Sequence, residues 1–293
     1  MDDDDWLAER FQAERTHLRA VAYRMLGSIS EADDAVQQTW LRLSRADSDS
    51  IENLGGWLTT VVARVCLNML RSRTTRREES FEVHVPDPLV SEATAIDPEQ
   101  ETLLADSVGL ALLVVLDTLE PAERLAFVLH DMFAVPFDDI AAMVGRTPEA
   151  ARQLASRARR RVQRDAAVPD PDLGRQREVV DAFFAAARHG DFDALVAVLD
   201  PEVVLRSDGG SRRTATALIR GAAAVAGQAL TFSHLSDFVR PALVNGAAGV
   251  VVAPGGRPTS VLGFTVRDGK IVEIDAITDP ARLRELDLAV LDD

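Results

Sequence analysis

The sequence has a single cysteine, Cys66, in 293 residues. One cysteine excludes an internal disulfide and a zinc site built from several thiolates, and its apolar neighbours favour a small buried hydrophobe. Long hydrophobic runs are also missing, since no stretch approaches the roughly 18 apolar residues that a membrane-spanning helix needs. The first residues, Met1 to Asp5, are acidic where a secretory signal would be basic. We therefore expect a cytoplasmic protein with no membrane partner.

Positive charge is scarce and unevenly placed. The chain has 47 acidic and 32 basic residues, for a net charge of −15, and a uniformly acidic protein would be repelled by nucleic-acid phosphates. The charge is segregated, however. Residues 78–123 hold twelve acids and no Lys or Arg, residues 152–164 hold six arginines and no acid, and residues 71–77 hold four more arginines. This distribution predicts two local surfaces that can meet an anion.

Apolar spacing predicts helices over 6–25 and 57–73, with a helix capped by Ser30 between them. The helical pattern returns after residue 102, whereas 78–101 and 165–174 are rich in proline and predict linkers, the first acidic and mobile. We predict a multidomain chain with a helical module at 1–77, an acidic linker at 78–101, a second helical module at 102–164, a linker at 165–174 and a third domain at 175–293.

The third domain changes class. Two helices separated by Gly190 are followed by a short strand at 203–206 and a helix near 216–230. Beyond them, Asn245-Gly246 and Asp268-Gly269 each lie between apolar runs, which is the strongest short signal for a β-hairpin. Helices followed by antiparallel strands predict an α+β domain.

Residues 140–149 have the form of a helix, a tight turn at Gly145 and a second helix opened by Thr147 and Pro148. This pattern predicts a helix-turn-helix. An arginine-rich surface helix is the alternative, but six arginines without a balancing acid argue against it. One face of the second helix is polar, as a major-groove recognition helix requires, and we assign DNA contacts to Thr147, Glu149, Arg152, Gln153, Ser156, Arg157 and Arg160.

The resemblance to a known family rests on several segments together. Residues 31–41 (EADDAVQQTWL), 57–64 (WLTTVVAR) and 70–73 (LRSR) resemble region 2 of the extracytoplasmic-function (ECF) RNA polymerase sigma factors. Residues 119–127 (LEPAERLAF) and the helix-turn-helix with RQLASRARR at 152–160 resemble region 4. The resemblance covers residues 6–164 and implies two all-α sigma modules.

The same resemblance implies a non-enzymatic subunit that binds core RNA polymerase, through its β and β′ subunits, and directs it to promoter DNA. The recognition helix would then read the −35 element. By position, the polymerase contacts would be Asp33, Asp34, Gln37, Gln38 and Leu41.

Contacts with the −10 element are implied for the end of the third helix and the polar loop at 44–56. A cationic helix end beside a polar loop suits single-stranded DNA with a flipped base. The alternatives are a solvated helix start for Asp33 and Asp34 and a dipole-complementing helix end for the arginines. The residues assigned to the −10 element are Arg64, Asn68, Arg71, Arg73, Arg76 and Arg77.

The third domain resembles the SnoaL-like α+β domain of the SigJ-like subset, a curved sheet and three helices around a conical pocket. In relatives this domain tunes activity in place of a separate anti-sigma protein. Three short motifs of the subset correspond to HVPDP at 84–88, DGGSR at 208–212 and TDPARL at 278–283. The resemblance implies contacts between linker and domain through Pro86, Asp87, Pro88, Asp208, Gly209, Gly210, Asp279, Pro280 and Leu283.

Alternatives remain for the linker, for the third domain and for the whole protein. The acidic linker either lies in the polymerase's RNA-exit path or is a solvated tether. A duplex-binding helix-turn-helix regulator is the second candidate for the chain, although it would have no use for region 2. We expect neither metal nor cofactor. The third domain either regulates without a ligand, senses a small ligand, or catalyses a reaction with acids and bases such as Asp181, His234, Asp237 and Asp275.

Overall fold

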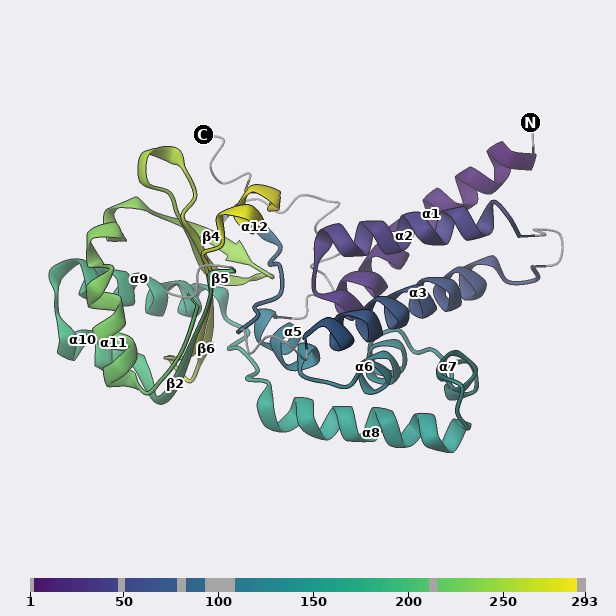
Figure 1. Cartoon of the computed structure of the whole chain (residues 1–293). Helices are drawn as coiled ribbons and strands as arrows, with labels where there is room; N and C mark the ends of the chain where they lie inside the picture. Colours follow the sequence, from purple (N-terminus) through teal and green to yellow (C-terminus); the bar gives the residue numbers. More distant parts are fainter. Residues whose placement is uncertain (1–2, 47–50, 78–82, 93–108, 211–215, 289–293) are drawn as a thin grey trace. The chain divides into compact units, whose positions relative to one another are not determined.

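The chain divides into two compact units, which Figure 1 shows in the computed structural model. The helical unit comprises Met1–Phe81 and Val115–Ala166, and the sheet unit comprises Glu82–Val114 and Ala167–Asp293. No helix in the described part of the chain is long and apolar enough to cross a membrane. The structure describes residues 3–46, 51–77, 83–92, 109–210 and 216–288.

Three long helices open the helical unit: α1 (Asp3–Leu26), α2 (Ile29–Leu43) and α3 (Leu54–Arg77). They pack on one another through fully buried side chains such as Leu18, Met25 and Leu58. Ser28 caps the start of α2, and its hydroxyl accepts a hydrogen bond from the Glu31 N–H. The sequence predicted Ser30 as this cap, which is wrong. Gly27 turns the chain with a positive φ, and the next residue, Ser28, already has the extended conformation that a cap requires.

The second half of the helical unit holds α6 (Pro121–Phe127), a π-helical turn η2 (Val128–Met132), α7 (Phe137–Val144) and α8 (Pro148–Asp165). Helix α5 (Leu110–Asp117) precedes them. Gly145 ends α7 in the left-handed conformation, at φ 68°, and the Thr147 hydroxyl caps α8 by accepting from Ala150 N–H. The predicted helix-turn-helix is confirmed.

A buried arginine joins the two halves of the helical unit. The side chain of Arg124 on α6 is 1% exposed and lies 3.1 Å from the Asp117 carboxylate. Its Nε and Nη2 also donate to the main-chain carbonyl of Arg24 on α1, at 3.3 and 3.2 Å. A buried guanidinium needs such partners, because an unpaired charge in the interior is costly.

The sheet unit is built on a seven-stranded sheet with the strand order β1-β4-β5-β6-β7-β2-β3. Neighbouring strands are antiparallel except β2 and β7, which are parallel. Two-residue turns at Asn245-Gly246 and Asp268-Gly269 join β4 to β5 and β6 to β7, with positive φ at all four residues, as such hairpins require. The strands are β1 (Val90–Glu92), β2 (Leu199–Asp208), β3 (Ala217–Arg220), β4 (Val239–Val244), β5 (Ala247–Val252), β6 (Ser260–Arg267) and β7 (Lys270–Ile277).

Helices α9 (Leu173–His189), α10 (Phe192–Val198) and α11 (Ala222–Thr231) pack on this sheet. The core between them contains Phe183, Leu195, Phe264 and Ile274. Short helices η3 (Ser233–Phe238), η4 (Pro254–Gly256) and α12 (Pro280–Glu285) complete the unit. The predicted fold class, helical modules followed by an α+β domain, is confirmed.

Two local predictions for this unit are wrong. The helix expected near 216–230 begins only at Ala222, because residues 217–220 pair with β2 as strand β3. The mobile linker expected at 78–101 is ordered at residues 83–92, and its strand β1 pairs with β4. In both places hydrogen bonds to distant segments decide the conformation, and such bonds leave no local pattern.

Candidate functional site

The polar face of α8 is exposed along its length. Its buried face is made of Ala151, Ala155 and Ala158, whose small side chains let the helix lie close to α6 and α7. Arg152 lies 3.6 Å from Glu149 and above the ring of Phe137. The residues assigned to the −35 element are all exposed: Thr147, Glu149, Arg152, Gln153, Ser156, Arg157 and Arg160.

Helix α2 presents most of the predicted polymerase contacts to solvent. Asp34, Gln37, Gln38 and Leu41 are exposed. Asp33 is half-buried and accepts two hydrogen bonds from the Arg19 guanidinium, at 2.8 and 3.1 Å. Asp33 therefore ties α2 to α1 in addition to any contact with a partner.

The residues assigned to the −10 element separate into three groups. Arg64, Asn68 and Arg71 are exposed on α3, and Arg64 Nη2 donates to the carbonyl of Ala142 on α7 at 3.3 Å. Arg73 is held by Glu31 and by the Leu26 carbonyl, so it has a structural role in this state. The side chains of Arg76 and Arg77, at the end of α3, lie outside the described residues.

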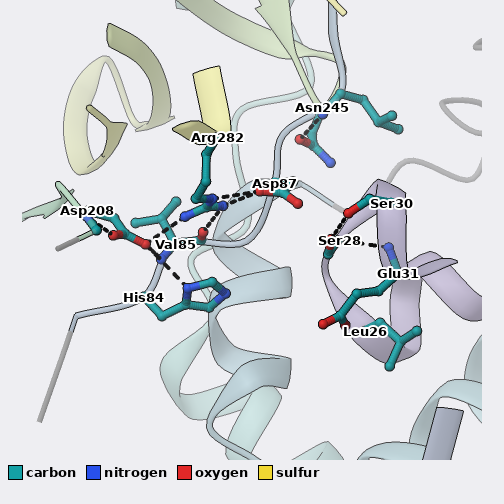
Figure 2. Close-up of polar contacts among 12 residues, drawn as sticks. Leu26, Ser28, Ser30, Glu31, His84, Val85, Asp87, Asp208, Asn245 and Arg282 are labelled. Carbon is teal, nitrogen blue, oxygen red and sulfur yellow. Dashed lines mark hydrogen bonds and ion pairs between the residues drawn. The ribbon is translucent and has the colours of Figure 1, made fainter. Parts of the chain in front are cut away.

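The linker anchor, as we call His84, Val85, Asp87, Asp208 and Arg282, joins three segments of the sheet unit (Figure 2). Arg282 Nη1 lies 2.7 Å from Asp208 Oδ2, its Nε lies 2.8 Å from Asp87 Oδ1, and its Nη2 donates to the Val85 carbonyl at 2.6 Å. Asp208 also accepts the Val85 N–H at 3.0 Å, and His84 Nδ1 lies 3.3 Å from the same oxygen.

The groups around Asp208 stabilise its ionised form. Burial alone raises the pKa of this carboxyl, but hydrogen bonds from His84 and from the N–H groups of Val85 and Gly210, with the charge of Arg282, lower it to about 2. The carboxylate is therefore ionised at neutral pH and pairs with the arginine.

The other predicted linker contacts surround the anchor. Pro86, Pro88 and Leu283 are buried, and Asp279 caps α12 by accepting the Ala281 N–H. Gly210 has φ +59°, and a Cβ there would overlap the Asp279 carboxylate, so only glycine fits. Gly209 N–H donates to the Thr216 hydroxyl, and Pro280 begins α12.

Sequence reasoning did not single out several residues that hold the linker. His84 and Arg282 were inside the quoted motifs but were not assigned contacts. Asn245 was predicted only as a turn residue. Its side-chain oxygen accepts the Leu89 N–H at 3.1 Å, and its main-chain N–H donates to the Leu89 carbonyl at 2.8 Å. The one signal for this network in the sequence was that Arg282 lies in one of the three motifs, while the other two contain the acids Asp87 and Asp208.

Family models match both parts of the helical unit. The model for sigma-70 region 2 matches residues 10–76 and the model for sigma-70 region 4 matches residues 109–162. The ECF RNA polymerase sigma factor SigJ of Mycobacterium tuberculosis is 40% identical over 92% of this chain and 91% of its own length. The chain belongs to the ECF sigma factors.

The likeness extends through the sheet unit. The probable ECF sigma factor SigI of Mycobacterium tuberculosis is 34% identical to this sigma factor, over 98% of each chain. The crystal structure of Mycobacterium tuberculosis SigJ has a TM-score of 0.78 at 36% identity, and covers 96% of this chain and 99% of that one. Like its family, this sigma factor is a transcription initiation factor and not an enzyme, and its partners are core RNA polymerase and promoter DNA.

The acid–base candidates of the sheet unit do not form a catalytic site in this sigma factor. Asp181 and His234 are exposed, and Asp237 pairs with Arg188. Asp275 is buried and pairs with Arg206 at 3.1 Å. Burial raises the pKa of Asp275 to about 6, against the opposing charge of Arg206. No group of His, Cys, Asp and Glu among the described residues could hold a metal ion.

Proposed function

We propose that the polar face of α8 reads the −35 element and that Arg64, Asn68, Arg71, Arg76 and Arg77 bind the −10 element. The exposure of the α8 face, with arginine and glutamine in its first turns, supports the first assignment, because such side chains read base edges in the major groove. Arg73 is left out, since Glu31 and a main-chain carbonyl hold it.

The exposed side of α2 supplies the core polymerase contacts in this proposal. Asp34, Gln37, Gln38 and Leu41 offer one acid, two amides and an apolar side chain 47% exposed to solvent. We assign this surface to the clamp helices of the β′ subunit and the region 4 module to the β subunit. The polymerase works in the cytoplasm, which is where we place this activity.

The regulatory part of the proposal concerns the segment between the two sigma regions. Residues 83–92 lie between the family matches at 10–76 and 109–162, yet they belong to the sheet unit. Strand β1 and the linker anchor hold them there. This single observation carries the proposal that the sheet unit restrains the sigma factor by holding its linker.

The role of the linker indicates whether holding it raises or lowers transcription. A sigma factor contacts the polymerase through regions 2 and 4 at once, and the linker sets how far apart they can lie. Holding 83–92 fixes the direction and span of ten residues, a stretch of at most roughly 35 Å when fully extended, so regions 2 and 4 lose freedom to adjust their separation. Release of these residues frees the acidic linker for the RNA-exit path and favours transcription.

The test is run-off transcription over the host's fragmented genome, with core polymerase and the full chain carrying Arg282→Ala. The substitution leaves Asp87 and Asp208 without their guanidinium, so the held state loses population and transcripts from discrete start sites rise severalfold, since about 1.4 kcal/mol is a tenfold population change.

The matched control is Arg206→Ala. Arg206 pairs two acids in the same sheet and its side chain is 18% exposed, as is that of Arg282, but its acidic partners are Glu273 and Asp275 rather than the linker. Transcription by R206A should stay at the level of the unsubstituted protein. Unchanged or reduced transcription by R282A would overturn the restraining role, and no discrete transcripts from any form would overturn the promoter assignments.

A further inference from the structure

The sheet unit has a partly open cavity of about 350 Å³ between its sheet and α9, α11 and η3. This volume lies in the range of sites for small organic molecules. The rings of Phe183 and Phe184 form part of the wall, with Leu235 and Val239 from the segment around η3 and Leu262 and Ile274 from the sheet. Apolar side chains dominate the lining.

The polar groups of the cavity are uncharged. Its lining, as far as the structure describes it, has no ionisable side chain, and its polar members are hydroxyls together with the amide of Gln228. Strand alternation explains this, because Leu205, Ser207, Ile274 and Ala276 line the cavity, whereas Arg206 and Asp275 alternate with them and pair with each other. A charged group placed against this lining would lose water without gaining a charged partner, which is costly.

The cavity and the linker anchor share a wall. Ser207 and Thr278 line the cavity, and each directly precedes an acid of the anchor region, Asp208 and Asp279. Thr278 donates to the Asp208 carbonyl from its N–H at 2.8 Å and from its hydroxyl at 3.3 Å. The parallel ends of β2 and β7 thus form the polar end of the cavity and carry the carboxylate that binds Val85 and Arg282.

We propose that this cavity binds a neutral, largely apolar small molecule with a hydrogen-bonding group at the Ser207–Thr278 end, and that its binding tightens the hold of the anchor on residues 84–92. The ligand fills space behind the strand ends that position Asp208, so the held linker and the filled cavity stabilise each other. By linkage the effect is reciprocal. The regulatory half of this inference rests on the proposed function, whereas the ligand class does not.

The ligand class is tested with two fluorescent probes on the full chain. N-phenyl-1-naphthylamine is neutral, and 8-anilino-1-naphthalenesulfonate adds a sulfonate to the same rings. We expect the neutral probe to bind at least about tenfold more tightly, because an unpaired buried charge costs more than the 1.4 kcal/mol that a factor of ten represents.

Variants locate the probe. Ala229→Phe places a ring in the cavity from α11, and Ala223→Phe places the same ring at an exposed position of that helix. A229F should lose binding and A223F should keep it. If A229F does not fold, Leu235→Trp fills the cavity from η3. Failure of the neutral probe to bind, binding as tight for the sulfonate, or unchanged binding in the filled variants would each overturn the ligand class.

Hydrogen exchange tests the coupling. The Val85 and Leu89 amides donate to Asp208 and Asn245, so their exchange reports release of the linker. With the neutral probe at about ten times its Kd, exchange should slow by up to about tenfold, and A229F should show no slowing. Binding that leaves both amides unchanged would overturn the coupling. If the probe slows exchange while R282A transcription is unaltered, the proposed function fails and the cavity inference stands.

Discussion

Several separate segments of the sheet unit converge on Asp208. Its carboxylate accepts from the linker at Val85, from its own turn at Gly210 and from α12 at Arg282. Its main-chain carbonyl accepts from Thr278 at the end of β7. Asp208 therefore connects the linker to the strand ends that line the cavity. Its ionisation state should affect the free energy of unfolding of the sheet unit.

We predict that the sheet unit loses stability as pH falls from about 4 to 2. The pKa of Asp208 is about 2 in the folded protein against 3.8 ordinarily, so its contribution is complete above the ordinary pKa and is lost as pH falls through the folded pKa. At 1.36 kcal/mol per pKa unit this contribution is about 2 kcal/mol. Urea unfolding at several pH values should show the loss in the unsubstituted protein and a smaller one in Asp208→Asn.

Asp275 provides an internal contrast. Its pKa is raised to about 6, so its protonation makes the folded protein more stable as pH falls through 6. This gain has the opposite sign to the loss of stability from Asp208 and occurs at higher pH. A D208N protein whose stability falls between pH 4 and 2 as steeply as that of the unsubstituted chain would refute the role assigned to Asp208.

Helix α8 is the element that we propose reads the −35 element. A recognition helix meets base edges with its N-terminal residues, and here those are Arg152 and Gln153 on the exposed face. Thr147 and Pro148 fix where the helix begins.

Arg152→Ala and Gln153→Ala should each weaken promoter binding by about 1–3 kcal/mol and relax selection at one base of the −35 element. Gln163→Ala is the control, because Gln163 is exposed on the last turns of the same helix. The measurement is binding of polymerase holoenzyme to promoters with single substitutions in the −35 element. Equal base preferences in R152A, Q153A and Q163A would show that this face does not read the element.

Elements with a local signature were predictable from the sequence. Asn-Gly and Asp-Gly predicted the two hairpins, and the turn predicted at Gly145 is where α7 ends. Strands β1 and β3 were missed, since their pairing with β4 and β2 is a property of distant segments.

The candidate sites follow the same division. Exposure of the α8 face could be inferred from helical spacing, whereas the tie between Arg73 and Glu31 depends on how α2 meets α3. The motifs placed Asp87 and Asp208 in one interaction by resemblance. The arginine that joins them, Arg282, became evident only from the fold.

Each of the two units has its own core and its own arginine that joins several polar partners. Arg124 serves the helical unit and Arg282 the sheet unit. Units with separate cores unfold separately unless a large apolar interface couples them.

We therefore predict two thermal transitions by calorimetry. Arg124→Ala should lower only the transition of the helical unit, by roughly 10 °C, because the partners of a buried guanidinium are left unpaired at a cost of about 3 kcal/mol or more. R282A should lower only the other transition. A single transition, or a joint shift of both in either variant, would contradict this independence.

Strand β1 has a further consequence for the released state. It covers the edge of β4 through the pairs from Val90↔Val244 to Glu92↔Ala242, and an uncovered edge strand offers unpaired N–H and C=O groups to other chains. Release of the linker would therefore leave the main-chain N–H and C=O groups of Ala242, Leu243 and Val244, at the end of β4, open to pairing with other chains. In our proposal the segment that restrains transcription also protects the edge of β4 from pairing with other chains. A sigma factor that stays for long in its released, active form would be prone to self-association.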